Sequence, residues 1–434
     1  MNIQLIRNQV IKDFSEHVSK YKTKYYKKLG VEIVMGKREG IYFWDISGKR
    51  YINCHCNGGV FNMGHKNPDI LNTLIEASKD FDIGNHHLIS GPRAMLAGKL
   101  SSSFQTSSRL ASDPISNTIF AVSGGEAIDL AIKMARGYTK KQKVISLLGG
   151  YHGHTGLALA AGDQKYKKPF AIQLPDFHQI PFGSWDAMEA SLSQDTAALI
   201  LETCPATLGM PIFPNEVMLR LRKQCTKNNV AMILDEIQTG LGRTGKTWAF
   251  QHYDILPDIV VAGKGLSGGI YPIAAVCFSK KYEKLFQKDP FIHISTFGGA
   301  ELGCFAALKT LELISESAFL ENVTTQAQYF SEQFNTLIRE NEEIVEFRQL
   351  GLFMAVVFQD SATCLTFIKT LMANGVYAVY ANNDKRVMQF LPPLIITGKE
   401  AEEVMSIIKT TLTDLKKFKN RLLKKVISTF VIKE

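Results

Sequence analysis

The stretch that decides the fold of this chain is Val230-Ala-Met-Ile-Leu-Asp-Glu-Ile-Gln-Thr-Gly240, together with the later run Ile259-Val-Val-Ala-Gly-Lys-Gly265. Each begins with a short apolar run, which is typical of a strand buried on both faces of a sheet. The first run ends in Asp235, and the second is followed by Lys264 between two glycines. Because parallel strands of an open α/β sheet end at a common edge, we expect Asp235 and Lys264 to lie at the mouth of the same sheet.

Short apolar runs alternate with helical runs through the middle of the chain. This alternation predicts an α/β fold in which helices flank a mainly parallel sheet. We expect strands at Thr118–Val122, Lys143–Leu148, Ala197–Glu202, Val230–Asp235 and Ile259–Ala262, and helices at Glu126–Tyr138 and Pro214–Asn228.

The length of 434 residues suits two linked domains better than one core. After a helix expected at Cys304–Ile314, the pattern changes to that of a smaller α+β domain. We therefore predict a large domain at 66–315 and a C-terminal small domain at 316–434, with the N-terminal segment 1–65 joining the small domain. The strands expected in the small domain are Met354–Phe358, Val376–Tyr380 and Val387–Leu391.

The net charge of +9 comes from the two ends of the chain. Residues 1–40 hold nine Lys and Arg against four acids, and residues 415–434 hold seven against one. Because the rest is near neutral and carries no recognised nucleic-acid motif, we expect solvated charged faces and no nucleic-acid partner. The apolar residues from Leu412 to Leu422 have helical spacing. This segment is either a helix that lies on a membrane surface or a last helix packed on its own domain, and we favour the second interpretation.

No apolar run approaches the length needed to span a bilayer, and the amino terminus lacks the apolar core of a signal peptide. The seven cysteines are scattered, without paired C-x-x-C spacing. Cys54-His55-Cys56 has no second ligand pair at zinc-finger spacing, so we predict buried thiols and no metal site. These features together predict a cytoplasmic protein without a membrane partner.

Ser123-Gly124-Gly125 lies between an expected strand and an expected helix. Glycines let the backbone approach a ligand, and the free N–H groups of a helix start attract an anion, so this loop is a candidate phosphate site. A tight turn has the same pattern, and no Gly-Lys-Ser/Thr follows. Tyr151, which follows Gly149-Gly150, is either a platform for a flat ring or a core aromatic.

Asp235 and Lys264 each lose hydration at the end of an apolar run. Asp235 can offset this cost only with a cation, such as a protonated pyridine nitrogen or an arginine. Lysine is rare in such a place unless it is paired, and the glycines beside Lys264 leave room for a substrate. Gln238, three residues after Asp235, places an amide within reach of a ring oxygen.

These residues resemble the class III pyridoxal-phosphate-dependent aminotransferases of fold type I, over most of the chain. The Asp-Glu-x-Gln-Thr-Gly and Gly-Lys elements are the most specific parts of the resemblance. It also places the segment 1–65 partly at a subunit interface. The matching motifs are Trp44-Asp45, Gly64-His65, Ser123–Ala127, Tyr151–Gly153, Glu202, Asp235–Gly240, Gly263-Lys264, Ser295–Gly299 and Leu391–Pro393.

The resemblance implies pyridoxal 5'-phosphate (PLP) as the cofactor, and an amine donor and a keto-acid acceptor as substrates. Lys264 would form the Schiff base, and Asp235 would pair with the pyridine nitrogen. Gln238 would meet the ring hydroxyl, and Tyr151 would stack on the ring. Thr296 would contact the cofactor phosphate of the neighbouring subunit, which implies a homodimer with shared active sites. The other cofactor-binding residues that the resemblance implies are Ser123, Gly124, Gly125, His152 and Glu202.

The chain departs from the family mainly on the substrate side. Gln389 stands where members that act on α-amino acids have an arginine for the α-carboxylate, and Thr207 stands where a glutamate gates that arginine. His154 stands where several members place an arginine or another donor, and Gly58 is a further candidate on this side. In the phosphate loop, Gly125 replaces the usual hydroxyl residue.

Two interpretations of the substrate follow from these departures. The donor is an amine, a diamine or an ω-amino compound, or another cation such as Arg93 or Arg243 binds a carboxylate. The segment Asp289-Pro-Phe-Ile-His293 favours the first, since it resembles the ω-amine and putrescine branch. An aminomutase, racemase or decarboxylase using the same cofactor stays an alternative, as does a scaffold that binds nucleic acid or acidic membrane through its basic ends.

Overall fold

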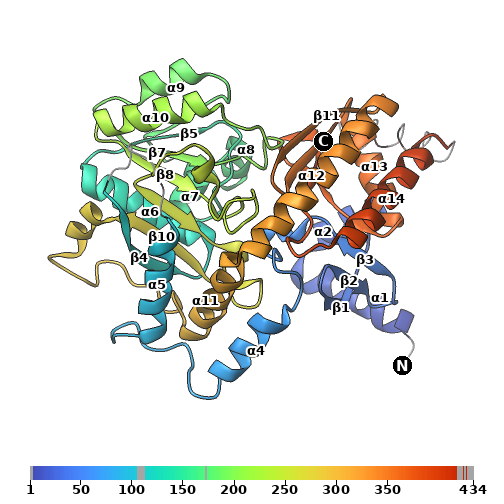
Figure 1. Ribbon diagram of the computed structural model, residues 1–434, viewed down its shortest axis with the longest axis horizontal. Helices are drawn as coiled ribbons and strands as arrows, with labels where there is room; N and C mark the ends of the chain where they lie inside the picture. The colour runs from blue at the N-terminus through green and yellow to red at the C-terminus, as the bar shows by residue number, and fades with distance from the viewer. Residues whose placement is uncertain (1–2, 105–112, 172–173, 418–423, 425–426, 428–434) are drawn as a thin grey trace.

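The computed structural model describes residues 3–104, 113–171, 174–417, 424 and 427. A larger lobe is built around a central sheet, and a smaller lobe combines N-terminal and C-terminal segments (Figure 1). Helix α11 (Glu301–Ser315) leads from the larger lobe into the long helix α12 (Ser317–Glu340).

The larger lobe contains a seven-stranded sheet with the order β4-β10-β9-β8-β7-β5-β6. The neighbours from β6 to β9 are parallel, and β10 is antiparallel to both β9 and β4. This mainly parallel sheet with flanking helices confirms the predicted fold class. The strands are β4 (Ile115–Ala121), β5 (Lys143–Leu147), β6 (Phe177–Ile180), β7 (Thr196–Glu202), β8 (Ala231–Asp235), β9 (Ile259–Ala262) and β10 (Ala274–Ser279).

Two strands of this sheet, β6 and β10, are missing from the strands expected from the sequence. β6 reads Phe-His-Gln-Ile at the sheet edge and is only partly buried, so it lacks an apolar run. β10 begins with two alanines, which have little intrinsic preference for strands. Its conformation is imposed by pairing with β4 on one side and β9 on the other.

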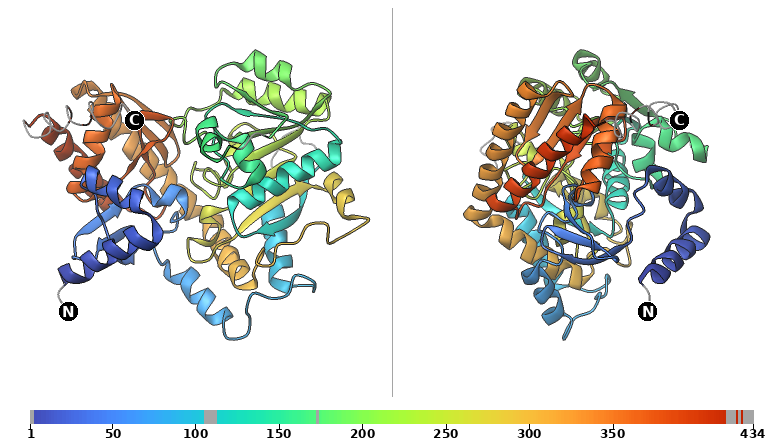
Figure 2. Two further views of the ribbon diagram at one scale, coloured as in Figure 1. Left: turned by 180° about the vertical axis from the view of Figure 1, so that it is seen from behind. Right: turned by 90° about the vertical axis from the view of Figure 1, so that its right-hand side faces the viewer.

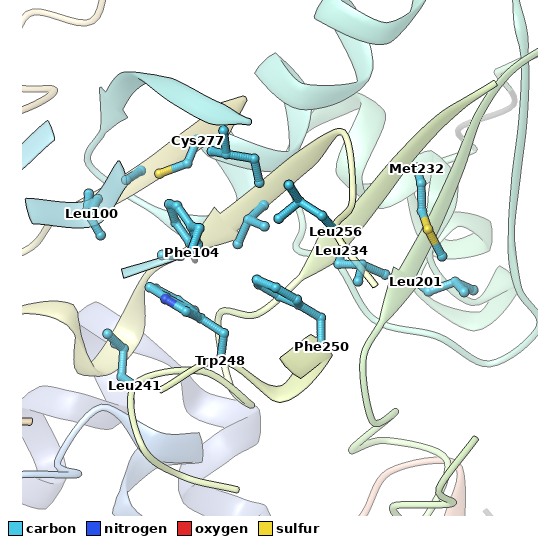
Figure 3. Close-up of a cluster of buried hydrophobic side chains, with 14 of the residues drawn as sticks. Leu100, Phe104, Leu201, Met232, Leu234, Leu241, Trp248, Phe250, Leu256 and Cys277 are labelled. Carbon is cyan, nitrogen blue, oxygen red and sulfur yellow. The ribbon is translucent and has the colours of Figure 1, made fainter. Parts of the chain in front are cut away.

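The central strands are buried on both faces because successive side chains point to opposite sides of a sheet. Ile233 and Leu234 of β8 accordingly belong to different hydrophobic clusters. Figure 3 shows part of the cluster that contains Leu234, together with Trp248 and Phe250. The longer helices of this lobe are α4 (Pro68–Ala77), α5 (Gly91–Ser103), α6 (Gly124–Thr139), α7 (Gly156–Ala161), α9 (Trp185–Ser191), α10 (Asn215–Lys227) and α11.

The smaller lobe contains two four-stranded sheets, β1-β2-β3-β13 and β11-β12-β15-β14. The second sheet is antiparallel throughout. The strands are β1 (Met35–Glu39), β2 (Tyr42–Asp45), β3 (Arg50–Asn53), β11 (Ile344–Leu350), β12 (Phe353–Phe358), β13 (Val376–Tyr377), β14 (Val379–Ala381) and β15 (Asp384–Phe390), and the helices are α12, α13 (Ser361–Ala373) and α14 (Gly398–Leu415).

The N-terminal and C-terminal parts of the chain form this lobe together. β3 pairs in parallel with β13, with Ile52 opposite Val376, and one hydrophobic cluster contains both Ile52 and Phe330. The single strand expected at Val376–Tyr380 is wrong in extent, because the structure divides it between β13 and β14 in different sheets. The predicted domain boundaries themselves stay predictions.

The two ends of the chain differ in how they pack. Helices α1 (Ile3–Asp13) and α2 (Lys20–Leu29) lie on the outside of the smaller lobe and contribute no buried residue (Figure 2). Leu412 of α14 is buried against that lobe, whereas Phe418 and Leu422 lie outside the described residues. Of the helices that the structure describes, none is long and apolar enough to cross a bilayer.

Candidate active site

The carboxyl edge of the large sheet brings the two residues of the opening stretch together. Asp235 is the last residue of β8 and pairs with Val261 of the parallel neighbour β9. Lys264 follows shortly after β9 and has a left-handed backbone, with a φ of 45°. This conformation strains a lysine, and residues with such strain cluster at functional sites. The expectation that both side chains lie at one sheet mouth is confirmed.

The side chain of Lys264 is half-buried and lies close to two other segments of the chain. Its Nζ donates to Oε1 of Gln238 at 3.4 Å, and a Cβ added to Gly58 would lie 3.2 Å from its Cε. Loss of hydration lowers the pKa of Lys264, and the charges of Asp235 and Glu202 oppose this shift. A lowered pKa increases the share of neutral amine, which is the nucleophilic form.

Asp235 is buried and oriented by two partners. Its Oδ2 lies 2.9 Å from Nδ1 of His152, and its Oδ1 accepts the N–H of Ile237 at 3.1 Å. Burial lowers the pKa of His152, but the hydrogen bond and the charge of Asp235 outweigh burial, so that the pKa is raised. The hydrogen bond to His152 and the bond from the Ile237 N–H hold the carboxyl group of Asp235 in one orientation at the sheet edge.

Glu202 is a second buried carboxyl group, opposite Asp235 in the register of β7 and β8. Its Oε1 accepts the N–H of Tyr151 at 2.9 Å, and its Oε2 accepts the N–H of Ala206 at 3.2 Å. Burial raises the pKa of Glu202 to about 7, against the lowering effect of His152. Glu202 therefore links the Tyr151 segment to the segment that leads toward Thr207.

The ring of Tyr151 belongs to a cluster of three rings. Its centroid lies 5.3 Å from that of His154 and 5.7 Å from that of Tyr166, and the latter two lie 5.2 Å apart. His154 is exposed, so the cluster borders solvent. No sequence motif marks Tyr166. It joins the cluster because the short helix α8 (Gln164–Lys167) packs beside Tyr151 and His154.

The start of α6 forms a cradle with little space for side chains. A Cβ added to Gly124 would lie 2.7 Å from Cδ1 of Ile237, and one added to Gly125 would lie 2.9 Å from Oγ1 of Thr155. Ser123 caps the helix, since its Oγ accepts the N–H of Glu126 at 3.4 Å. Free backbone N–H groups at a helix start bind anions, and the two glycines keep the approach to them open.

The residues expected on the substrate side, Thr207 and Gln389, are buried and uncharged. Nε2 of Gln389 donates to the carbonyl oxygen of Ala206 at 3.2 Å, and Oγ1 of Thr207 donates to that of Gly149 at 3.0 Å. Asn383, which no sequence motif marks, donates its backbone N–H to the oxygen of Thr207 at 2.9 Å and its side-chain amide to Gly149. These bonds join the C-terminal part of the chain to the large sheet.

Thr296, a further predicted cofactor residue, differs from Lys264 and Asp235 in its exposure. It is exposed, in the segment between β10 and α11. Within the described residues, the hydrogen bonds of Lys264, Asp235 and Gln238 do not reach it. Its predicted role concerns a neighbouring subunit.

The chain is similar to a known protein family over most of its length. Residues 25–412 match the family described as Aminotransferase class-III. The chain is a class III aminotransferase. It is 50% identical over 396 residues to an uncharacterized aminotransferase of Archaeoglobus fulgidus, and the match covers 91% of this chain and 92% of that protein. The resemblance predicted from the motifs is therefore confirmed.

Solved structures of two named enzymes share the fold of this aminotransferase. The ornithine aminotransferase of Toxoplasma gondii is 26% identical, with a TM-score of 0.83 over 96% of this chain and 99% of that one. A second structure of that enzyme holds PLP in partial occupancy at its active site. The acetylornithine aminotransferase of Elizabethkingia anophelis is 27% identical, with a TM-score of 0.77 over 91% and 99%.

Class III aminotransferases depend on PLP, so PLP is the cofactor of this enzyme. The residues at the sheet edge fit such a molecule. Lys264 would supply an amine for the aldehyde, Asp235 would supply a carboxylate for the ring nitrogen, and Gly124 and Gly125 would keep the start of α6 free of side chains for the phosphate. Ile237 lies between the start of α6 and the Lys264 segment, since its side chain is next to both Gly124 and Gly263. Which residue performs which role stays a prediction.

The two arginines considered as alternative carboxylate partners are engaged elsewhere in this aminotransferase. Arg243 is fully buried and donates to the carbonyl oxygens of Leu352 at 3.0 Å and Pro392 at 2.6 Å. Arg93 donates to the carbonyl oxygen of Gly299 at 2.7 Å and to two further carbonyl groups. Both guanidinium groups thus hold loops together.

Proposed function

We propose that this aminotransferase takes an amino group from an amine, a diamine or an ω-amino donor whose reacting carbon bears no carboxylate, and passes it to a keto acid. The observation that carries the proposal is the pairing of Gln389 with the carbonyl oxygen of Ala206. A substrate carboxylate buried at this place needs a cationic partner, and Gln389 and Thr207 offer none. The engagement of Arg93 and Arg243 with backbone carbonyls supports the same conclusion.

The surroundings of Lys264 suit an alkyl chain with a terminal amine. Tyr151, His154 and Tyr166 provide apolar ring surface beside the site, and Gly58 leaves the space next to Lys264 without a side chain. The similar solved enzymes are named for ornithine and acetylornithine, and both molecules carry an amino group. In ornithine one of the two amino groups is terminal, which favours an ω-amino donor over an α-amino acid.

In the proposed chemistry, Lys264 would hold the cofactor through its aldehyde group. When bound, PLP supplies this aldehyde and a ring that withdraws electrons from the reacting carbon. The amine of Lys264 would also take the proton from the reacting carbon of the substrate, a role that the lowered pKa of Lys264 favours. Asp235, oriented by His152, keeps the ring nitrogen protonated.

The remaining cofactor residues hold the ring and the phosphate in this proposal. Gln238 meets the ring hydroxyl, and Tyr151 stacks on the ring with its backbone held by Glu202. Ser123, Gly124 and Gly125 bind the phosphate through the start of α6.

We further propose a homodimer in which Thr296 contacts the cofactor phosphate of the partner. Thr296 is exposed in a segment rich in exposed apolar side chains: Phe291, Ile292, Ile294 and Phe297 are 49%, 64%, 46% and 56% exposed. A cluster of exposed apolar side chains is typical of a subunit interface. Sedimentation should give a mass of two chains, and Phe297→Glu should yield monomers that lose cofactor; a wild-type monomer with full activity contradicts the proposal.

A cytoplasmic location is also proposed. All seven cysteines are buried and unpaired, which suits a reducing compartment.

A donor screen tests the proposed reaction. Purified enzyme is mixed with monoamines, diamines, ω-amino acids and α-amino acids, each with pyruvate or 2-oxoglutarate, and the absorbance of the bound cofactor is followed. Terminal amines should react in the presence of a keto acid, and Lys264→Ala should abolish the reaction. Turnover of α-amino acids alone would contradict the donor class. Formation of more than one equivalent of product per active site without any keto acid would instead indicate an aminomutase, racemase or decarboxylase.

A further inference from the structure

Glu236 is a buried carboxyl group next to the site, with a full set of hydrogen bonds. It has no exposed surface. Its Oε1 accepts Oγ1–H of Thr203 and N–H of Phe250, both at 2.8 Å. Its Oε2 accepts Oγ1–H of Thr239 at 2.8 Å and N–H of Ala249 at 3.0 Å. Four donors therefore converge on one carboxyl group, two on each oxygen.

The donors come from three separate places in the fold. Thr203 directly follows Glu202 at the end of β7, and Thr239 lies in the turn after β8. Ala249 and Phe250 begin the short 3₁₀ helix η3 (Ala249–His252). The carboxyl group thus ties the ends of two neighbouring strands to a helical turn outside the sheet.

The backbone of Glu236 adds two further ties. Its N–H donates to the oxygen of Val261 in β9 at 2.9 Å, and its oxygen accepts the N–H of Gly240 at 3.0 Å. The first bond joins the turn to the strand that leads to Lys264. The second closes the turn that carries Gln238.

Asp235 and Glu236 are adjacent but have different partners. Asp235 faces His152 at the site, whereas Glu236 faces Ala249 and Phe250. The turn from Glu236 to Gly240 is therefore anchored through contacts separate from those that orient Asp235.

We propose that Glu236 is a positioning residue that fixes this turn, so that Asp235 and Gln238 keep their places relative to Lys264. The inference rests on the proposed roles of Asp235 and Gln238 toward the cofactor. It adds a residue that contacts neither cofactor nor substrate and acts through the turn that it holds.

The chemistry of the four donors explains why a carboxylate is needed here. The backbone N–H groups of Ala249 and Phe250 can only donate, and they address different oxygens of Glu236. A glutamine at this position has only one oxygen, and its NH₂ group would face one of these two backbone N–H groups. That N–H group would then have no acceptor. Glu236→Gln therefore keeps the size of the side chain and removes the hydrogen bonds to one of the two carboxyl oxygens.

A matched control exists in the same sheet. Asp258 is also fully buried, and its Oδ2 accepts an N–H of the Arg222 guanidinium at 2.8 Å and the backbone N–H of Met232 at 2.9 Å. It precedes β9, at the end of the strand opposite Lys264. Asp258→Asn removes a buried charge from the sheet without touching the turn after β8.

The test compares Glu236→Gln and Asp258→Asn as holoenzymes and, after cofactor removal, as cofactor-free proteins. Both variants should show a lowered midpoint of thermal unfolding without cofactor. Only Glu236→Gln should weaken PLP binding, by at least about tenfold, and shift the pH midpoint of the cofactor absorbance by about half a unit or more. If both variants keep the wild-type affinity and absorbance titration, Glu236 has a structural role only and the proposal is overturned.

A milder pair of variants covers the case in which Glu236→Gln does not fold. Thr239→Val removes one of the four donors at nearly constant volume, and Thr239→Ser keeps it. Thr239→Val should show the same changes in PLP affinity and absorbance titration as Glu236→Gln, but smaller. Thr239→Ser should keep the wild-type affinity and titration. Equal behaviour of the two variants overturns the proposal. These readouts need no amino donor, so a negative donor screen leaves them interpretable.

Discussion

Replacing Gln389 with arginine should destabilise the enzyme unless Thr207 is replaced by glutamate as well. Gln389 and Thr207 are 6% and 9% exposed, and Gln389 donates to Ala206, the residue before Thr207. An arginine at position 389 loses hydration without gaining a carboxylate partner. An uncompensated buried charge costs about 3 to 5 kcal/mol. The glutamate at 207 alone should cost a similar amount for the same reason.

A double-mutant cycle measures the coupling between the two positions. The four proteins are wild type, Gln389→Arg, Thr207→Glu and the double variant, compared by the urea midpoint of the holoenzyme. The double variant should regain about 1 to 3 kcal/mol relative to the sum of the single changes. Gln389→Met serves as an uncharged control, and it should cost only about 1 kcal/mol for the lost hydrogen bond.

The same four proteins test the substrate argument. The double variant should gain activity with α-amino acids, because a gated arginine then faces the site, while the wild type should prefer terminal amines. Additive stability changes, within about 0.5 kcal/mol, would show that the two side chains do not meet. An unchanged donor range in a well-folded double variant would refute the use of Gln389 and Thr207 as determinants of carboxylate preference.

Two further predictions concern the cofactor site. Gly124→Val should weaken PLP binding at least about tenfold in a titration, because its Cβ would lie 2.7 Å from Cδ1 of Ile237, whereas Gly98→Ala, with nothing within 4 Å, should bind normally. Glu202 should make the enzyme less stable as pH rises from about 4.5 to about 7, because the folded state keeps its proton over this range and the unfolded state loses it. The difference between the folded and unfolded pKa of Glu202 corresponds to about 3 kcal/mol of stability. In Glu202→Gln the midpoint of unfolding should therefore depend less on pH over this range; the same pH dependence as in the wild type would show that Glu202 does not cause it.

The site could be predicted from the sequence where charged residues directly follow buried strands. Asp235 and Lys264 are such residues, and the parallel order of β8 and β9 makes their proximity a matter of topology. The glycines at the start of α6 are a local signal of the same kind, since they follow a strand and begin a helix. In these cases neighbouring residues carry the information.

The partners of these residues could not be predicted in the same way. His152 lies 83 positions from Asp235, and Gln389 lies 183 positions from Ala206. The anchoring of Glu236 by Thr203 and Phe250 likewise depends on how β7 and η3 pack against the turn. β10 was missed because its alanines become a strand only through pairing on both sides.

By itself, the sequence determined the α/β fold and the charged pair Asp235 and Lys264, because strand patterns and the residues that follow them are local properties of the chain. Its motifs also carried the resemblance to the class III aminotransferases. The tertiary structure alone decided that Asp235 faces His152, that Arg93 and Arg243 are bound to backbone carbonyls, and that Gln389 pairs with an oxygen. These contacts arise when segments far apart in the chain are buried together, and burial decides which polar groups must satisfy one another.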